Sequence, residues 1–293
     1  MRQIDPMGRI AAATWLDRAA GAVRTATAKT LRPGRFKDAL HGVWLGHPLH
    51  PALAQFPLGC FTGAAVLDLT DASGGAADRL IRWGLLGSAP AAIAGLADYA
   101  DGHEEQQRIG VVHAAANVSA IACYLGSLRL RSVGSRQGGV ALGLLAYGLA
   151  AGAAALGGDL AFRWAAGPNH AAEVPHAGPA DWTDLGAVTE FAERKPQRRM
   201  AGLIPVMVVA RSDGFVVLHD RCGHMAAPLY QGELTSRAGV DCVVCPWHRS
   251  VFRLADGAVV NGPATAPQPV LDTRVLDGRL QAKVREIPGV AAS

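Results

Sequence analysis

Four long stretches without a charged side chain constrain the fold of this chain more than any other feature. They cover residues 51–67, 83–97, 109–128 and 137–158. A bilayer span takes roughly 17 to 25 mainly apolar residues, and the second stretch reaches that length only with Arg82 and Asp98 at its ends. A backbone in lipid must satisfy its own hydrogen bonds, which favours helices. The sequence therefore predicts four transmembrane helices.

The composition supports membrane helices over the alternative, a soluble helical bundle rich in Ala and Gly. Half of the 293 residues are hydrophobic and only 18% are charged, so the mean hydropathy is positive. Several uncharged spans in succession are hard to place in water. Gly84, Gly95 and Gly143 would let neighbouring membrane helices pack closely. We therefore expect an N-terminal all-α bundle in the membrane.

The basic N-terminal region sets the expected orientation. Eight Lys and Arg side chains lie among alanines in residues 1–41, without the apolar core of a cleavable signal peptide. The apolar side chains of Ile10, Trp15, Leu16 and Val23 fit either a helix on the membrane surface or a disordered tail. The positive-inside rule places this region in the cytoplasm, and four spans return the C-terminal region to the same side.

Two short motifs in the last quarter of the chain carry metal-ligand residues. Cys222 and His224 form C-x-H, and after a gap of 20 residues Cys245 and His248 form C-x2-H. This spacing is typical of a Rieske [2Fe–2S] centre, in which two His replace two Cys on one of the two irons. A Cys2His2 zinc site uses the same ligand types, but a C-x-H half is unusual in zinc sites. The pattern predicts the cluster, with the two cysteines on one iron and the two histidines on the other.

The residues around these ligands resemble the ferredoxin-type Rieske domain. The motifs that carry the resemblance are CGHMAAPL at 222–229, GEL at 232–234, CPWH at 245–248, Phe252, Gly257 and GPA at 262–264. The resemblance covers about residues 181–286 and implies a small antiparallel β fold with the cluster at one tip. Two β-rich runs separated by a hairpin signal at 212–214 agree with that fold. Cys242 is expected to be a buried strand cysteine.

Departures from the family pattern bear on the reduction potential. High-potential members carry two extra cysteines, and the disulfide between them clamps the cluster loops. Ala227 and Trp247 occupy those positions here, so we expect a lower reduction potential within the window of about −150 to +300 mV. The missing disulfide also agrees with a cytoplasmic domain. Ser250 occupies the position of a serine that can hydrogen-bond a sulfide in the high-potential branch. Ala226 and Arg249 replace family glycines and are expected to crowd the loops, or Arg249 to add positive charge near a partner surface.

The predicted spans resemble a family of four-helix bacterial membrane proteins of unknown function. The motifs are GHPLHP at 46–51, FPLG at 56–59, GLADY at 95–99, His113-Ala114 with Asn117, and GGDL at 157–160. The resemblance covers about residues 41–167 and implies no activity. It implies a bacterial protein, for which we expect the inner membrane, with the Rieske domain in the cytoplasm.

Antiparallel spans would bring five polar residues of this block to one membrane face. They are His47, His50, Asp98, His113 and Asn117. Ionisable residues at membrane depth are costly, which points to function. We hypothesise a redox or proton-handling site that ligates haem b through two histidines on facing helices, or that binds a quinone headgroup. The alternative is a set of polar residues that cap helix ends at the headgroup layer.

The predicted organisation has five parts. They are a basic N-terminal tail (1–40), a four-helix transmembrane domain (41–166), a Gly/Pro-rich linker (167–180), an all-β Rieske [2Fe–2S] domain (181–287) and a C-terminal tail (288–293). A flexible linker would give the Rieske domain mobility between partners.

These features predict a membrane-tethered electron-transfer protein that serves redox partner proteins. One alternative is a membrane oxidoreductase that links quinol or haem to a cytoplasmic acceptor through the histidines. Another is a redox-sensing or anchoring module without turnover. A terminal oxygenase would need a further iron site with two His and a carboxylate, and no such sequence element follows the cluster motifs. The net charge of +4 gives no reason to invoke nucleic acid.

Overall fold

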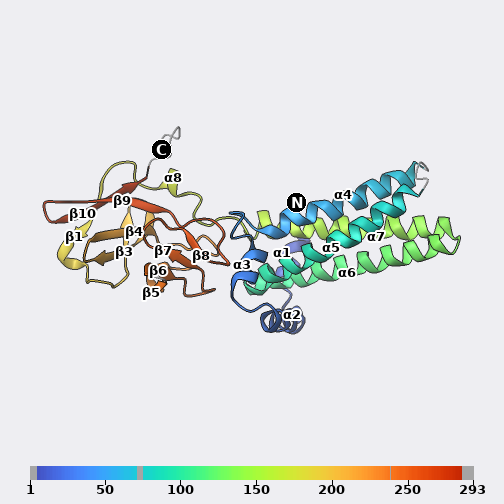
Figure 1. Cartoon of the computed structure of the whole chain (residues 1–293), viewed down its shortest axis with the longest axis horizontal. Coiled ribbons are helices and arrows are strands. Elements are labelled where there is room, and N and C mark those ends of the chain that lie inside the picture. Colours follow the sequence, from blue (N-terminus) through green and yellow to red (C-terminus); the bar gives the residue numbers. More distant parts are fainter. Residues whose placement is uncertain (1–4, 71–74, 238, 286–293) are drawn as a thin grey trace. The chain divides into compact units, whose positions relative to one another are not determined.

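A computed structural model describes residues 5–70, 75–237 and 239–285, and it divides into two compact units (Figure 1). The helical unit comprises Met1–Pro33 and Pro48–Ala166, and the β unit comprises Gly34–His47 and Gly167–Ser293. The chain therefore passes between the two units three times. The predicted C-terminal tail, residues 288–293, lies outside the described residues.

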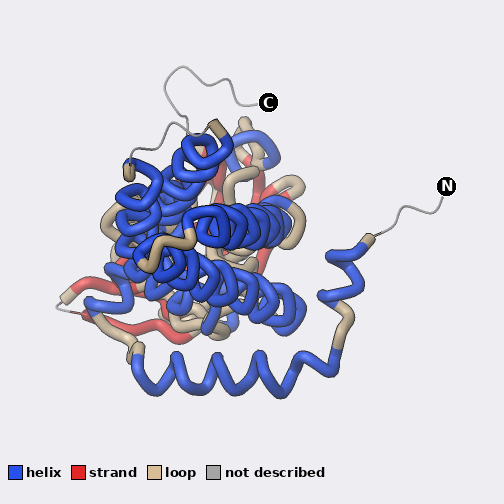
Figure 2. Tube along the Cα trace, turned by 90° about the vertical axis from the view of Figure 1, so that its right-hand side faces the viewer, coloured by secondary structure: helices blue, strands red, loops and turns tan. Residues whose placement is uncertain are grey.

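Four long helices form the core of the helical unit. They are α4 (Leu49–Leu69), α5 (Ala76–Ala100), α6 (Glu104–Ser132) and α7 (Arg136–Phe162), and they run side by side (Figures 1 and 2). All four are long and apolar enough to cross a membrane, judged by length and composition. The predicted four-helix domain is confirmed, and each uncharged stretch lies within one helix.

The helical unit contains an internal repeat that the sequence analysis did not detect. Side chains at equivalent positions of α4 and α6, 63 residues apart, face each other. The facing pairs are His50 with His113 (ring centroids 6.3 Å apart), Phe61 with Tyr124 (4.1 Å, stacked) and Asp68 with Arg131 (Oδ1–Nη1 2.9 Å). Close glycine contacts repeat too, because a Cβ added to Gly63 would meet Leu80 and one added to Gly126 would meet Leu142. The hairpins α4–α5 and α6–α7 are thus related by an approximate two-fold axis.

The N-terminal residues form helices, which is one of the two outcomes expected for them. They are α1 (Pro6–Ala11), the 3-10 turn η1 (Thr14–Leu16) and α2 (Asp17–Thr30). Helix α2 runs across the direction of α4–α7 (Figure 2). Arg108 of α6 pairs with Asp17 (Nε–Oδ1 2.6 Å), and the Tyr99 hydroxyl donates to the carbonyl of Ala20 (3.0 Å). Trp15 remains 79% exposed, as suits a helix that lies on a membrane surface.

Two antiparallel sheets make up most of the β unit. The six-stranded sheet has the order β1 (Thr183–Ala187), β10 (Arg279–Val284), β9 (Val270–Leu276), β4 (Gly214–His219), β3 (Ile204–Arg211) and β2 (Gln197–Ala201). The four-stranded sheet has the order β5 (Glu233–Arg237), β6 (Val240–Val244), β7 (Val251–Arg253) and β8 (Val259–Asn261). The predicted all-β domain is confirmed, including the β3–β4 hairpin.

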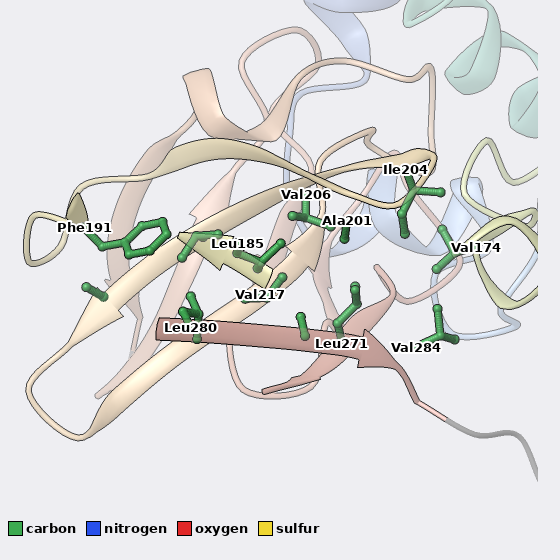
Figure 3. Close-up of a cluster of buried hydrophobic side chains, with 13 residues drawn as sticks. Val174, Leu185, Phe191, Ala201, Ile204, Val206, Val217, Leu271, Leu280 and Val284 are labelled. Carbon is green, nitrogen blue, oxygen red and sulfur yellow. The ribbon is translucent and has the colours of Figure 1, made fainter. Parts of the chain in front are cut away.

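Strand β3 is buried on both faces and separates two hydrophobic cores. Its side chains alternate, so that Val206 and Val208 enter the core shown in Figure 3, together with Leu271 and Leu280. Met207 and Val209 point the other way, into a core shared with the second sheet. Cys222 and Cys245 belong to this second core, which therefore extends to the predicted ligands.

The segment 167–180 is folded onto the β unit, so the structure does not show the mobile linker expected from its Gly and Pro content. Val174, which starts the short helix α8 (Val174–Ala177), belongs to the first core. The His170 N–H donates to the carbonyl of Gly223 (2.9 Å), and the Val284 N–H donates to that of Pro179 (2.8 Å). Apolar burial and backbone hydrogen bonds thus hold both ends of the segment.

Helix α3 (Arg35–His41) also packs with the β unit, although it precedes the first membrane-length helix. Asp38 accepts hydrogen bonds from the Asn261 side chain (2.9 Å) and from the Gly262 N–H (2.9 Å). His41 is buried, at 2% exposure. The boundary predicted between the tail and the membrane domain, at residues 40–41, falls inside this helix.

Buried His219 at the end of β4 predicts a loss of stability in acid. Burial lowers the pKa of His219 from 6.5 to about 4. The unfolded chain therefore binds the proton more readily, so stability is complete above about pH 6.5 and falls as the pH falls toward 4, by up to about 3 kcal/mol. Denaturant unfolding of the full chain in detergent between pH 7 and pH 4.5 measures the loss.

His219→Gln should flatten this pH dependence, because the uncharged amide binds no proton. His176→Gln is the matched control, since His176 is exposed. A His219→Gln chain that keeps the wild-type dependence on pH would contradict the prediction.

Candidate metal centre

The two motifs lie on loops that are closed by the same pair of backbone hydrogen bonds. In the first loop, Cys222 N–H donates to the Ala227 carbonyl (2.9 Å) and Ala226 N–H donates to the Cys222 carbonyl (2.8 Å). In the second loop, Cys245 N–H donates to the Ser250 carbonyl (2.8 Å), and Arg249 N–H donates to that of Cys245 (3.2 Å). The loops are therefore two copies of one turn, each beginning at a cysteine.

The fifth residue of each turn adopts a left-handed backbone conformation. The φ angles of Ala226 and Arg249 are 57° and 64°. This conformation costs a residue with a Cβ roughly 1–2 kcal/mol, and glycine avoids the cost. The family glycines are thus explained by backbone conformation, whereas the sequence had suggested crowding. The Arg249 side chain is 67% exposed and extends to within 4.0 Å of Glu233.

The structure brings all four predicted ligands together, in two pairs. The buried thiols of Cys222 and Cys245 hydrogen-bond each other. The rings of His224 and His248 lie edge to face, with centroids 5.0 Å apart, and both are half-buried. A two-iron cluster needs this arrangement, because each iron takes two ligands of one kind.

A single zinc ion would instead need all four ligands to converge on one point. Within the described part of the chain, no three His, Cys, Asp or Glu side chains are grouped so that they could hold one ion. The donor set therefore fits the binuclear cluster better than the zinc alternative.

Backbone N–H groups surround both thiols. Those of His224 and Met225 donate to Cys222, and those of Trp247 and His248 donate to Cys245. The hydrogen bond between the thiols raises the pKa of Cys222, and burial raises it further. The same bond lowers the pKa of Cys245 to about 7, although burial opposes the shift. Hydrogen bonds to the sulfurs also help to set the potential of a bound cluster.

Gln268 fixes the first loop, and the sequence analysis did not single it out. This side chain is 1% exposed. Its Oε1 accepts from the Gly223 N–H (3.0 Å), and its Nε2 donates to the carbonyls of His219 (2.7 Å) and Arg221 (2.6 Å). Its position between Pro267 and Pro269 could have indicated this role, because the two prolines restrict the backbone that carries the polar side chain.

The segment around Gly262 supports the second loop. Ser250 is fully buried, and its hydroxyl oxygen accepts from the Ala264 N–H (2.9 Å). Asp38 accepts a hydrogen bond from the N–H of Gly262, two residues before Ala264. A Cβ on Gly262 would lie 3.1 Å from Val43, so this glycine permits the close approach of the α3 segment. Ser250 and Asp38 thus fix neighbouring residues of one supporting loop.

Three of the predicted membrane-face residues lie together in the helical unit. The rings of His50 and His113 face each other, and the Asn117 amide lies 3.1 Å from Nε2 of His113. His47 belongs to the segment that packs with the β unit. Asp98 lies on α5, near its C-terminal end. The structure therefore joins His50, His113 and Asn117 as one group.

Replacing Gln268 with Ala is predicted to destabilise the β unit and loosen the first loop. The substitution leaves one N–H and two carbonyls without this partner in a buried environment. We expect a loss of about 2 to 4 kcal/mol in the free energy of unfolding. Denaturant titration of the full chain measures this loss, and iron content reports cluster retention. Gln231→Ala is the matched control, because Gln231 is exposed. Equal stability of the two variants would contradict the prediction.

Two family models match the chain. Residues 181–278 match the Rieske [2Fe-2S] domain, and residues 46–169 match the predicted membrane protein family DUF2231. The anthranilate 1,2-dioxygenase ferredoxin subunit of Burkholderia cepacia is 35% identical over 105 residues, which are 36% of this chain and 94% of that protein. The 3-phenylpropionate/cinnamic acid dioxygenase ferredoxin subunit of Photorhabdus laumondii is 34% identical over 28% of this chain and 76% of that protein.

Among solved structures, the ferredoxin of carbazole 1,9a-dioxygenase from Nocardioides aromaticivorans is similar at 20% identity. The match covers 36% of this chain and 98% of that one, with a TM-score of 0.33. The Rieske domain implies a [2Fe–2S] cluster, and the helical domain and four apolar helices indicate a membrane protein. The chain therefore belongs to the Rieske [2Fe–2S] family through its β unit, joined to a DUF2231 membrane domain.

Proposed function

We propose that this chain is a membrane-tethered electron-transfer protein whose cluster accepts and passes on one electron at a time. Cys222 and Cys245 would hold the inner iron, and His224 and His248 the outer iron. The observation that carries this proposal is the separation of the four ligands into a buried thiol pair and a half-buried imidazole pair. Two relatives are named as ferredoxin subunits, which supports a carrier role.

The exposed end of the centre suits electron exchange with a protein partner. When bound, the cluster supplies a one-electron couple near the surface. His224 and His248 orient its outer iron toward solvent, and Trp247, which is 49% exposed, lies beside His248 with ring centroids 6.4 Å apart. A flat apolar side chain next to the exposed ligand is a natural contact for a redox partner. Ala227 and Trp247 stand where high-potential members have the two disulfide-forming cysteines. This difference supports a reduction potential lower than that of the high-potential members.

We place the Rieske domain on the cytoplasmic side of a bacterial inner membrane. The basic residues of the first 41 positions support this orientation through the positive-inside rule. Arg131 lies in the last turn of α6, the third span, where a positive charge would count against this orientation. Its side chain is 2% exposed and paired with Asp68 and Asp78. Its charge is therefore neutralised inside the protein, which strengthens the remaining bias.

A second candidate function is a membrane oxidoreductase that uses haem or quinone in the helical unit. The observation that favours it is the facing pair His50 and His113, which lies inside the helical unit and is separate from the cluster ligands. A second redox group would let the chain link a membrane donor to a cytoplasmic acceptor.

Serine substitutions of the proposed thiolate ligands test the cluster assignment. Cys222→Ser and Cys245→Ser should each abolish the EPR signal and visible circular dichroism of a reduced Rieske cluster, because oxygen replaces a soft sulfur ligand. Cys242→Ser is the matched control, since Cys242 is also buried, on β6, yet forms no part of the ligand set. Metal analysis of the full chain should find two irons that are not bound in haem. One tightly bound zinc with no iron would overturn the proposal.

A further inference from the structure

His50 and His113 meet at the approximate two-fold axis of the helical unit. Their ring centroids are 6.3 Å apart, with the ring planes at 88°. Two imidazoles bound to one metal through bonds of about 2 Å, on opposite sides of it, place their ring centres about 6 Å apart. The separation therefore corresponds to the width of one metal ion between the rings.

Backbone carbonyls determine the tautomer of both rings. Nδ1 of His50 lies 2.8 Å from the carbonyl oxygen of Ala91 on α5, and Nδ1 of His113 lies 2.7 Å from that of Ala153 on α7. A carbonyl can only accept, so both Nδ1 atoms carry the proton. Each Nε2 then presents a lone pair, which is the form of histidine that binds a metal.

Matching glycines let both rings approach the neighbouring helices. A Cβ added to Gly95 of α5 would lie 2.9 Å from Nδ1 of His50, and one added to Gly157 of α7 would lie 3.3 Å from Cε1 of His113. Each ring thus contacts both a backbone carbonyl and a glycine of the neighbouring helix. The hydrogen bond from the second ring nitrogen to a backbone carbonyl is the usual means of orienting a metal-binding histidine.

We propose that the helical unit binds a b-type haem between α4 and α6, with His50 and His113 as its two axial ligands. This inference rests on the second function proposed above and specifies its cofactor. Haem iron brings four nitrogen ligands of its own and needs only two from the protein. A bare ion would need more ligands, and the residues that the structure describes contain no third metal-binding side chain grouped with the pair.

The hydrogen-bonding groups favour haem over a quinone. A quinone headgroup needs donors for its two carbonyl oxygens, whereas the N–H groups of both rings are used by backbone carbonyls. The Asn117 amide lies 3.1 Å from Nε2 of His113 and 3.0 Å from its carbonyl. Asn117 must turn aside for an iron to bind, so it is not needed by a haem. The equivalent position in the other half of the repeat is Ala54.

Small buried side chains accompany the pair on the neighbouring helices. Ala91, Ala94 and Ala97 of α5 are 5% exposed or less, and Ala153 of α7 is fully buried. Small residues at these positions let α5 and α7 approach the histidine pair closely.

The test is an optical and EPR analysis of the full chain, produced in haem-replete cells and purified in mild detergent. The dithionite-reduced minus oxidised spectrum should show the α-band of a six-coordinate b-type haem, and pyridine haemochromogen analysis should give its stoichiometry. His50→Ala and His113→Ala should each lose the haem. His103→Ala is the matched control that should retain it. The Rieske EPR signal of each variant reports whether the chain is folded.

Two further variants keep the test independent of folding defects. His50→Gly with added imidazole should regain the six-coordinate spectrum, because the free ligand fills the cavity. Asn117→Ala should retain haem, whereas a quinone site would lose its donor.

Each outcome separates this inference from the carrier function. A full Rieske signal without haem, even after haemin titration, overturns the haem site and leaves the electron carrier intact. Haem that survives both histidine substitutions also overturns it, as does a copurifying quinone that is lost in Asn117→Ala. Haem dependent on both histidines in a chain without a Rieske signal would support the site and refute the carrier function.

Discussion

The β unit depends on holding two six-residue turns at a fixed separation, because each iron of the proposed cluster takes one ligand from each turn. Each turn contains a non-glycine residue in a strained, left-handed conformation, which persists only when the surrounding structure enforces it. The surrounding structure therefore has to fix both. Gln268 does so for the first turn with three buried hydrogen bonds. Ser250 does so for the second turn through the loop that Asp38 also holds.

Two of these supports bring in chain segments that connect the units. Helix α3 and the segment 167–180 both leave the helical unit and both are folded onto the β unit, one beside Gly262 and the other beside Gly223. A change in either segment would therefore reach the backbone of a supporting loop or a cluster turn. This arrangement differs from a ferredoxin on a flexible tether, in which the connecting chain contributes nothing to the centre.

Sequence patterns with a strict physical cause were sufficient to predict the helices, the β domain and the grouping of the four ligands. Uncharged stretches of membrane length have few alternatives, and the spacing of Cys222, His224, Cys245 and His248 reflects one coordination geometry. The roles of Asp38 and Gln268 could not be predicted in this way, because each depends on a partner far away in the chain. The repeat also escaped detection, since its halves share positions more than residue types: Phe61 corresponds to Tyr124, and Asp68 to Arg131.

The repeat shows how an apolar bundle tolerates polar residues at a two-fold axis. Equivalent positions face each other there, so a charged residue would meet its own copy and be repelled. At one end the two halves have diverged to Asp68 and Arg131, which neutralise each other. At the other end both halves have histidine at the equivalent position, so His50 faces His113. Two facing imidazoles are compatible with a low-dielectric interior only when both are neutral. Neutral imidazole is also the form that binds a metal, so one metal ion could be coordinated by both lone pairs. The contrast between the two ends is therefore the structural reason to regard His50 and His113 as ligands rather than as helix caps.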